Sequence, residues 1–371
     1  MAIKLPKINK RELLYYVRRA LAIFFAWSLI SNLIFFYDYY LLTSNGALTS
    51  AYDFKQSFTT NLIIHVSAGL IGGFLTVNLM EYALRKYVFY RALILITILY
   101  TIAAIIVSSL GAMYFFSQEF GVGYFDDKVI AQLFLFFKSW LFIKNFITWL
   151  IIVLTTLIIL MVNKKYGPGV FPDYLMGRYF RPKNERRIFM FADIKDATGI
   201  AEKLGEEKYF NFLKDFFKDI SPAIMQTRGE VYQYVGDEIV ISWKIKQGLK
   251  RCNAIQCYYI MYDSIHAKKE LYFKKYGLSP IFKVGYHFGN IMVGEIGQIK
   301  REIVFSGDVL NTASRIQSVC NALGVSILAS KEFADMQLKL PPNLERKDLG
   351  EEKLKGKQTE ISLVTYTRKN A

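Results

Sequence analysis

Two different hydrophobic patterns divide the chain near residue 162. Before that point the apolar stretches are long, and beyond it short apolar runs of strand and helix length alternate with polar segments. A helix needs about 20 mostly apolar residues to cross the roughly 30 Å hydrocarbon core of a membrane. Four stretches meet this requirement: Ala20–Tyr37, Leu62–Met80, Ala92–Phe116 and Phe146–Val162. We therefore predict a helical membrane domain with four transmembrane helices over residues 1–162.

The distribution of Lys and Arg predicts how these helices are oriented. Of the 47 Lys and Arg residues, 20 lie in residues 1–187, against 9 Asp and Glu. Six precede the first stretch, Arg85 and Lys86 lie between the second and third, and seven lie between Lys164 and Arg187. The other two loops are poor in Lys and Arg. Because cytosolic loops carry the excess of these residues, we expect both termini in the cytosol and a multi-pass protein of the inner or plasma membrane.

The same distribution bears on the partners of the protein. A formal net charge of +16 would suit a nucleic-acid binder, but the basic excess flanks the apolar stretches, as membrane orientation requires. We therefore expect membrane lipid, and no nucleic acid, among the partners. The three cysteines all lie in the second half of the chain. So few cysteines exclude a disulfide scaffold and fit the reducing cytosol.

A linker is predicted between the membrane domain and the rest of the chain. Glycines and prolines interrupt residues 163–184, from Gly167 to Pro182, and they break regular structure. The segment is either a simple tether or an element that couples the membrane domain to a soluble domain over residues 185–371. The residues alone favour neither alternative.

The soluble domain shows the pattern of an α+β fold. Its predicted order is strand, helix, two strands, helix and strands, which is the ferredoxin-like β-α-β-β-α-β arrangement. The predicted elements are Arg187–Phe191, Gly199–Ile220, Glu230–Tyr234, Glu238–Trp243, Lys250–Tyr276, a hairpin of Phe282–His287 and Asn290–Glu295, helix Asp308–Leu323 and strand Val325–Ala329.

Two aspartates are expected at one edge of this sheet. Asp193 ends the first predicted strand in FADIKDAT, and Asp237 lies in the hairpin turn of YVGDEIV. In a ferredoxin-like sheet these elements are neighbours, so the carboxylates converge, and they repel each other unless cations bridge them. Such a pair is a natural Mg²⁺ site. The backbone N–H groups of Ile194–Thr198, which lead into a helix, are placed to hold phosphate oxygens.

Two further motifs supply groups for binding phosphate. In NTASR, Asn311 and Arg315 are four residues apart and share one face of a helix, and an arginine stabilises charge that develops on a transferring phosphoryl group. In LKGK, Lys355 and Lys357 flank a glycine before a strand, and such lysines reach a triphosphate as point charges. Taken singly, each of these residues also fits an ordinary cap, surface or turn position.

Together these segments resemble the catalytic domain of class III adenylate and guanylate cyclases over about residues 185–368. The similarity lies in five motifs in the family's order: FADIKDATGIAEKLG, GEVYQYVGDEIVISW, VGYHFGNIMVGEIG, FSGDVLNTASRIQ and LKGK. The first half of the chain is similar, more loosely, to the multi-span anchors that many bacterial members carry.

The resemblance implies a reaction in which the ribose 3′-OH of a nucleoside triphosphate attacks the α-phosphate and pyrophosphate leaves. Two Mg²⁺ or Mn²⁺ ions would be held by Asp193, Asp237 and the carbonyl of Ile194. Asn311 would orient the ribose, and Arg315 would stabilise the transition state. The remaining substrate contacts that we expect are Lys355 or Lys357 at the β- and γ-phosphates, with Lys283 and Thr198.

The resemblance also implies a homodimer, formed through the catalytic domains and, we expect, the membrane domains. In this family the metal aspartates and the Asn/Arg pair face each other across a head-to-tail dimer. One chain here holds both sets, so a homodimer would contain two complete sites.

Three positions depart from the family pattern. Asp196 stands where the family often has glycine, close to the phosphates. Gln233 stands where adenylate cyclases usually have lysine and guanylate cyclases glutamate, and Val304 stands where adenylate cyclases usually have aspartate or threonine. Gln233 both donates and accepts hydrogen bonds, so it suits adenine or guanine. ATP is favoured because bacterial members of the family mostly use it.

Other functions remain as alternatives. The protein is a guanylate cyclase if the base pocket selects GTP, or a regulatory cyclase-fold protein if Asp196 or that pocket disables it. In a diguanylate cyclase, VGDEI would be the signature hairpin, but Val235 and Ile239 depart from that motif, and NTASR and LKGK have no place in it. Sensing by the membrane domain fits the sequence better than transport, because its spans carry few charges.

The orientation predicts the outcome of reporter fusions. Fusions at Ser50 and Phe125 should both report the side of the membrane opposite the cytosol, because the loops around them are poor in Lys and Arg. Paired alkaline phosphatase and green fluorescent protein fusions measure this, with a fusion after Val162 as the cytosolic control. A cytosolic signal at either loop would contradict the four-helix topology.

Overall fold

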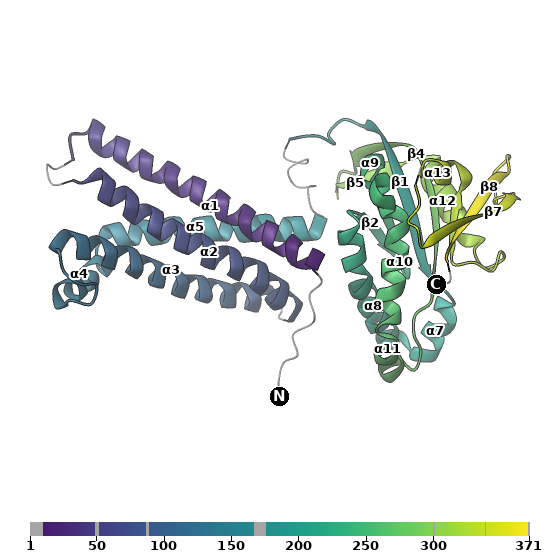
Figure 1. The fold of residues 1–371 in the computed structure, drawn as a ribbon, viewed down its shortest axis with the longest axis horizontal. Helices are drawn as coiled ribbons and strands as arrows, with labels where there is room; N and C mark the ends of the chain where they lie inside the picture. The colour runs from purple at the N-terminus through teal and green to yellow at the C-terminus, as the bar shows by residue number, and fades with distance from the viewer. Residues whose placement is uncertain are drawn as a thin grey trace. The chain divides into compact units, whose positions relative to one another are not determined.

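The computed structural model describes residues 10–48, 52–86, 89–166, 176–299, 301–337 and 339–369. The chain divides into two compact units, an N-terminal unit of Met1–Val162 and a C-terminal unit of Asn163–Ala371. Figure 1 shows that the first is helical and that the second is built on a sheet.

Long apolar helices make up the N-terminal unit. Helices α1, α2, α3 and α5 lie side by side, and their shared core contains Trp27 of α1, Tyr100 of α3 and Val153 of α5 (Figure 1). The short helix α4 follows α3 in a segment that the sequence was expected to use as a loop. The bounds are α1 Lys10–Ser44, α2 Phe54–Lys86, α3 Phe89–Phe120, α4 Asp127–Phe137 and α5 Trp140–Tyr166.

Three of these helices are long and apolar enough to cross a membrane within the described residues. They contain Val17–Ser44, Leu93–Phe120 and Trp140–Val162, which match the first, third and fourth predicted spans. The second predicted span, Leu62–Met80, lies within α2. Part of α2 falls outside the residues whose side chains the structure describes, so a total of four spans stays a prediction.

Glycines allow α2 to pack closely on α1. A Cβ atom at Gly72 would lie 2.1 Å from the ring of Trp27, and one at Gly73 would lie 2.9 Å from the carbonyl oxygen of Ala20. Small residues on one helix face permit such close approach inside membranes. Trp27 is held in place by a 2.9 Å hydrogen bond from its Nε1 to the hydroxyl of Thr156.

Eight strands among the described residues form one sheet in the C-terminal unit. Their order is β2-β3-β1-β4-β6-β8-β7, and β5 pairs with β4. Strand β1 pairs antiparallel with both β3 and β4, so the first four strands have the ferredoxin-like order that the sequence predicts. The bounds are β1 Lys183–Ile194, β2 Glu230–Val235, β3 Glu238–Lys244, β4 Phe282–Ile296, β5 Glu302–Ser306, β6 Ile327–Ser330, β7 Leu344–Glu352 and β8 Ile361–Arg368.

Helices cover the two faces of this sheet. Successive side chains of β1 point to opposite faces of the sheet and join different hydrophobic cores. Ile188 packs with α8 and α10 on one face, whereas Phe189 packs with α12 on the other. The helix bounds are α7 Ala197–Leu204, α8 Glu206–Gln226, α9 Ile245–Leu249, the 3₁₀ helix η1 Lys250–Cys252, α10 Asn253–His266, α11 Lys269–Tyr276, α12 Asp308–Ser318 and α13 Lys331–Asp335.

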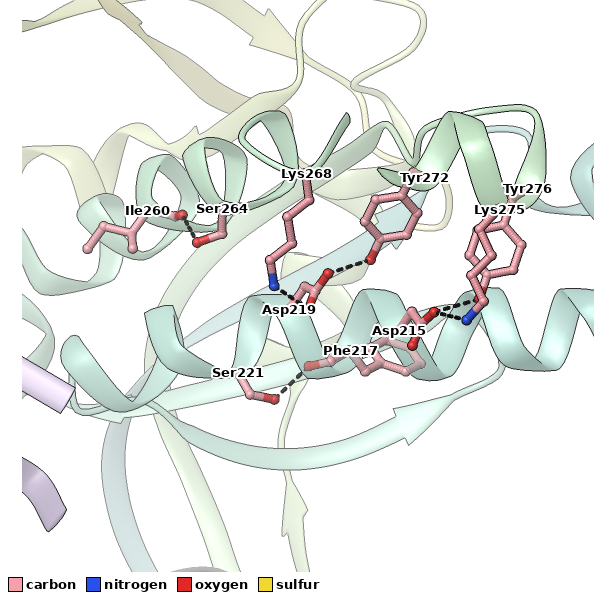
Figure 2. A network of polar contacts seen from close by, with 10 residues as sticks. All are labelled: Asp215, Phe217, Asp219, Ser221, Ile260, Ser264, Lys268, Tyr272, Lys275 and Tyr276. Carbon is pink, nitrogen blue, oxygen red and sulfur yellow. Dashed lines mark hydrogen bonds and ion pairs between the residues drawn. The ribbon is translucent and has the colours of Figure 1, made fainter. Parts of the chain in front are cut away.

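Two aspartates join α8 to Lys268 and to α11 (Figure 2). Asp219 accepts hydrogen bonds from Lys268 at 2.6 Å and from the hydroxyl of Tyr272 at 3.0 Å. One turn earlier, Asp215 accepts from Lys275 and from the hydroxyl of Tyr276, each at 2.6 Å. The apolar faces of α8 and α10 hold the core, and these polar contacts fix the outer side of the same helix layer.

The predicted hairpin of Phe282–His287 and Asn290–Glu295 is wrong. Residues 282–296 form the single strand β4, which pairs with β1 over twelve residues, and the hairpin joins β4 to β5 instead. The predicted strands leave Phe288 and Gly289 for a turn, and glycine is common in turns. Gly289 has a different purpose: a Cβ there would lie 2.6 Å from Val309 of α12.

Both long helices predicted in the C-terminal unit are broken. Gly205, at φ +75°, separates α7 from α8, because glycine adopts this left-handed conformation without the strain of a side chain. The second predicted helix, Lys250–Tyr276, is divided at Lys268 into α10 and α11. Strand β7 has no counterpart among the predicted elements.

The described end of the predicted linker packs on the C-terminal unit. Tyr179 is 8% exposed and lies in the core with Phe189 and Val309. Its carbonyl oxygen accepts a 3.1 Å hydrogen bond from the N–H of Glu295. Residues 167–175, the middle of the predicted linker, lie outside the described residues, so its coupling role stays a prediction.

The contact between α12 and β4 predicts a stability effect at Gly285. A Cβ atom there would lie 2.3 Å from the backbone nitrogen of Gln317 and 2.6 Å from the carbonyl oxygen of Ala313. Neither backbone atom can turn aside, so Gly285→Ala should lower the free energy of unfolding by about 1–3 kcal/mol, the usual cost of overpacking. Thermal denaturation of the full-length protein measures this. Gly294→Ala on the same strand is the control, because its nearest neighbour would be 3.3 Å away; equal effects would contradict the argument.

Candidate active site

Asp193 lies near the end of β1, on the face of the sheet that α12 covers. Its partner across the strand pair is Lys283 of β4, whose Nζ lies 3.4 Å from Oδ2 of Asp193. The same oxygen accepts a 2.9 Å hydrogen bond from Nε2 of Gln317 on α12. The carboxylate is therefore held by one cation and one neutral donor.

Asp237 meets Asp193, as the sequence predicts. It follows Gly236, whose φ of +60° makes the tight turn between β2 and β3. Burial and the adjacent Asp193 carboxylate, which also shares a hydrogen bond with it, raise the pKa of Asp237 to about 6. Burial and the same two aspartates raise the pKa of the neighbouring Glu238 to about 7. Negative charge is thus concentrated here beyond what Lys283 compensates.

This concentration of carboxylates suits divalent cations. Among the described residues, no group of three or more His, Cys, Asp or Glu side chains is arranged as a metal site by itself. Mg²⁺ is commonly bound through one or two carboxylates, with substrate phosphates and water completing its shell. Asp193 and Asp237 fit that pattern, and the carbonyl of Ile194 is one residue away.

Asp196 adopts the left-handed conformation, with φ 57° and ψ 39°. Glycine adopts it without cost, and this gives a conformational reason for glycine at the position. The carboxylate is folded against the first turn of α7: a Cβ at Gly199 would lie 2.7 Å from its Oδ1. It makes no capping hydrogen bond. It therefore places negative charge beside the turn where Ile194–Thr198 were expected to hold phosphate, and Thr198 itself is exposed.

Helix α12 has a buried side that faces the sheet and a more exposed side that faces away from it. Its buried residues include Ala313 and Gln317, whereas Asn311 is exposed and Arg315 is half-buried. Gly285 and Gly289 of β4 allow the buried side to approach the sheet closely. The Asn/Arg pair therefore shares one side of the helix, as its spacing predicts.

The LKGK turn lies beside this helix. The guanidinium of Arg315 approaches Gly356, where a Cβ would be 3.2 Å from its Nη2. Lys357 forms an ion pair with Asp308 at the start of α12, and its hydrogen bond holds the pKa of the Asp308 carboxyl below its usual value. Buried Leu354 anchors the turn in the core around Ile316. Arg315 and Lys357 are thus brought together.

The two expected base-reading positions lie on strands that contact each other. Tyr232 of β2 and Phe305 of β5 stack with ring centroids 4.6 Å apart, and the Tyr232 hydroxyl accepts a hydrogen bond from the backbone N–H of Phe305. The adjacent Gln233 is exposed and Val304 is half-buried.

The expected site residues therefore lie in two main groups. Asp193, Asp237 and Lys283 lie together at the sheet edge, while Arg315 and Lys357 lie together at α12. Lys283, which was expected with the other phosphate-binding lysines, belongs to the first group. Gln317 was missed, although its spacing of four residues from Ala313 placed it on the inner face of the helix. Lys355 is exposed in the turn between β7 and β8.

A family model identifies the C-terminal unit. The model of the adenylate and guanylate cyclase catalytic domain matches residues 182–367, which include both groups of site residues. The chain therefore belongs to the adenylate and guanylate cyclase family.

Relatives with curated names agree with this family. Adenylate cyclase 2 of Rhizobium meliloti (strain 1021) is 30% identical over 209 residues, which cover 56% of this chain and 57% of that protein. An adenylate cyclase of Anabaena cylindrica is 27% identical over 184 residues, covering 48% of this chain and 36% of that protein. The chain thus spans about half the length, or less, of these relatives.

Solved cyclase structures also match. The structure of a bacterial light-regulated adenylyl cyclase matches with a TM-score of 0.48 and 21% identity, over 58% of this chain and 63% of that one. The adenylyl cyclase CyaB of P. aeruginosa matches with a TM-score of 0.44 and 18% identity, over 52% of this chain and 98% of that one.

The raised pKa of Asp237 predicts that metal binding depends on pH. The folded protein keeps a proton on Asp237 up to about pH 6, whereas the ordinary pKa is 3.8, so the metal-free fold loses stability as the pH rises between these values. A bound divalent cation compensates both the burial of the carboxylate and the repulsion from Asp193 that raise this pKa. The increase in melting temperature on adding Mn²⁺ should therefore be larger at pH 7.5 than at pH 5, as scanning fluorimetry of the full-length protein measures.

Asp237→Asn serves as the control for this effect. It removes the titrating group, so the Mn²⁺-induced increase should become small at both pH values. An equally large increase at both values in the unaltered protein would contradict the assignment of Asp237.

Proposed function

We propose that the protein is a membrane-anchored adenylate cyclase that converts ATP to 3′,5′-cyclic AMP and pyrophosphate in a homodimer. The observation that carries the proposal is the meeting of Asp193 and Asp237 at the sheet edge, inside the part of the chain that the cyclase family model matches. The names of the relatives support adenine as the base.

The metal site supplies the activation of the nucleophile. Two Mg²⁺ or Mn²⁺ ions held by Asp193, Asp237 and the Ile194 carbonyl would lower the pKa of the ribose 3′-OH and neutralise phosphate charge. The 3′ oxygen forms a bond to the α-phosphorus, and its proton leaves to solvent. The bond between the α-phosphorus and the oxygen that bridges to the β-phosphate breaks, and pyrophosphate leaves with that oxygen. Lys283 compensates the carboxylates in the absence of substrate.

The residues on and beside α12 act on the substrate. Asn311 orients the ribose, and Arg315 donates hydrogen bonds to the α-phosphate oxygens as negative charge develops on them. Lys355 and Lys357 attract the β- and γ-phosphates. The ion pair of Lys357 with Asp308 keeps that lysine beside Arg315 before substrate binds.

A dimer explains how the two groups of residues act on one nucleotide. Within one chain, α12 uses its buried side to contact Asp193 through Gln317, whereas Asn311 and Arg315 lie on its other side. This separation favours a site that takes its metal aspartates from one chain and its Asn/Arg pair from the partner. A C₂ dimer then contains two such sites.

GTP remains the alternative substrate because the amide of Gln233 both donates and accepts hydrogen bonds. Val304 offers no side-chain hydrogen bond to either base. Incubation of the purified protein with ATP or GTP and Mg²⁺ or Mn²⁺, followed by chromatography of the products, tests the proposed reaction. Formation of cyclic AMP from ATP supports it, and the absence of any cyclic nucleotide would contradict it.

The N-terminal unit is the proposed anchor. Its three long apolar helices within the described residues and the Lys and Arg distribution favour a multi-pass membrane protein with both termini and the catalytic domain in the cytosol.

Complementation tests the shared site. Asp193→Ala and Arg315→Ala should each be inactive alone. When the two variants are co-expressed, half of the dimers are mixed, and each mixed dimer has one intact site. Activity should therefore return to roughly a quarter of that of the unaltered protein, as C₂ symmetry requires. Cyclic AMP formation in membranes measures it.

The matched control co-expresses Asp193→Ala with Asp237→Ala. Every mixed dimer then carries a damaged metal pair in both sites, so no activity should return. If pull-down proves co-assembly of Asp193→Ala with Arg315→Ala and activity still does not return, the shared-site arrangement is wrong.

A further inference from the structure

Gln317 is a buried polar residue that the proposed reaction does not use. Its residue is 4% exposed, in the last turn of α12. Its side-chain nitrogen donates a 2.9 Å hydrogen bond to Oδ2 of Asp193, 124 residues away in the sequence. Packing alone would accept an apolar side chain at this buried position. The amide instead makes a hydrogen bond to one of the two aspartates proposed to hold metal.

We propose that Gln317 is a positioning residue that orients the Asp193 carboxylate for the divalent cations. The proposal rests on the proposed function, because it presumes that Asp193 holds the metal ions. The terminal torsion of an aspartate is broad, so an outside donor is needed to fix the carboxylate plane. The hydrogen bond holds Oδ2 of Asp193 from the side of α12.

The support behind Gln317 is rigid. Gly285 of β4 lies directly under it, where even a Cβ would be 2.3 Å from the Gln317 backbone nitrogen. On the neighbouring turn, Ala313 is fully buried against the same strand. The distance between helix and strand is therefore set by backbone contact, and the amide reaches Asp193 from a fixed point.

The neutrality of the amide distinguishes it from the other group at Asp193. The Lys283 ammonium also approaches Oδ2, at 3.4 Å, but its positive charge opposes an incoming cation and its long side chain is flexible. An amide donates a hydrogen bond without that repulsion. Gln317 can thus keep its contact with Asp193 in both the metal-free and the metal-bound site, which Lys283 cannot do without cost.

The decisive variant is Gln317→Met, which keeps the length of the side chain and removes the donor. Outer-shell partners of metal ligands typically affect metal affinity by about 10- to 100-fold. We therefore expect the Kd for Mn²⁺ to rise by about tenfold or more. Electron paramagnetic resonance of free Mn²⁺ measures this with the full-length protein in detergent, in the presence of 3′-deoxy-ATP, which lacks the attacking hydroxyl. The readout does not depend on turnover.

Gln256→Met is the matched control. Gln256 is a half-buried glutamine of α10, on the opposite face of the sheet, so the same substitution there should leave the Mn²⁺ Kd unchanged. The melting temperature without metal verifies that each variant is folded. If Gln317→Met does not fold, Gln317→Asn replaces it, because the shorter amide is polar but cannot reach Asp193. An unchanged Mn²⁺ Kd in the folded variant would overturn the proposal.

A mixed dimer locates the effect. One chain carries Arg315→Ala and supplies the intact Asp193 of the single working site, and its partner carries Asp193→Ala. Gln317→Met should raise the Mn²⁺ concentration for half-maximal activity only when it is on the first chain, with the KM for ATP at saturating Mn²⁺ changed less than twofold. An effect only from the other chain would mean that Gln317 acts on Arg315 and would overturn the proposal.

Failure of the proposed function gives a different result. If the unaltered protein forms no cyclic nucleotide, yet its Mn²⁺ binding is weakened by Asp193→Ala and by Gln317→Met, the reaction is wrong and the positioning role stands. If Asp193→Ala leaves Mn²⁺ binding unchanged, the metal site itself is wrong, and the positioning role falls with it.

Discussion

The distance between α12 and β4 is the constraint on which the catalytic unit depends. It is set by backbone contact at Gly285 and by the absence of a side chain at Gly289. At this distance the inner side of α12 reaches Asp193 through Gln317, and its outer side presents Asn311 and Arg315. One helix therefore supports two sets of reactive groups, and a displacement of its axis would disturb both. Backbone contact tolerates less adjustment than contact between side chains, which explains the use of glycine in the middle of a strand that otherwise disfavours it.

The contacts around Asp193 show how the fold tolerates two carboxylates placed side by side. Burial beside a second carboxylate is unfavourable, and the structure reduces the cost in three ways: a hydrogen bond with Asp237, an ion pair to Lys283 and a hydrogen bond from Gln317. The carboxylate pair is thus compensated within the fold, while its negative charge keeps an electrostatic preference for cations. At α12 the charges are reversed: Arg315 and Lys357 are both positive, and the carboxylate of Asp308 holds Lys357 beside Arg315.

The sequence predicted the strand order and the meeting of Asp193 with Asp237, because alternation of apolar residues and a Gly-Asp turn are local signals that survive in the folded sheet. The prediction of elements was wrong at two glycines that do not form the expected structure. Gly289 suggested a hairpin but makes room for α12, and Gly205 breaks a helix whose apolar pattern continues across it. The spacing within the helix placed Gln317 on its inner face, but its contact with Asp193 could not be predicted, because only the packing of α12 brings these two residues together.

Tyr179 determines where a mechanical load from the linker enters the C-terminal unit. Its buried ring and its carbonyl bond to Glu295 attach the chain to the β4–β5 hairpin before β1 begins. A movement of the preceding residues therefore reaches that hairpin before it reaches β1. Phe305 of β5 and Val309 of α12 pack in the same cluster as Tyr179, so the linker is attached beside the expected base pocket and the start of α12.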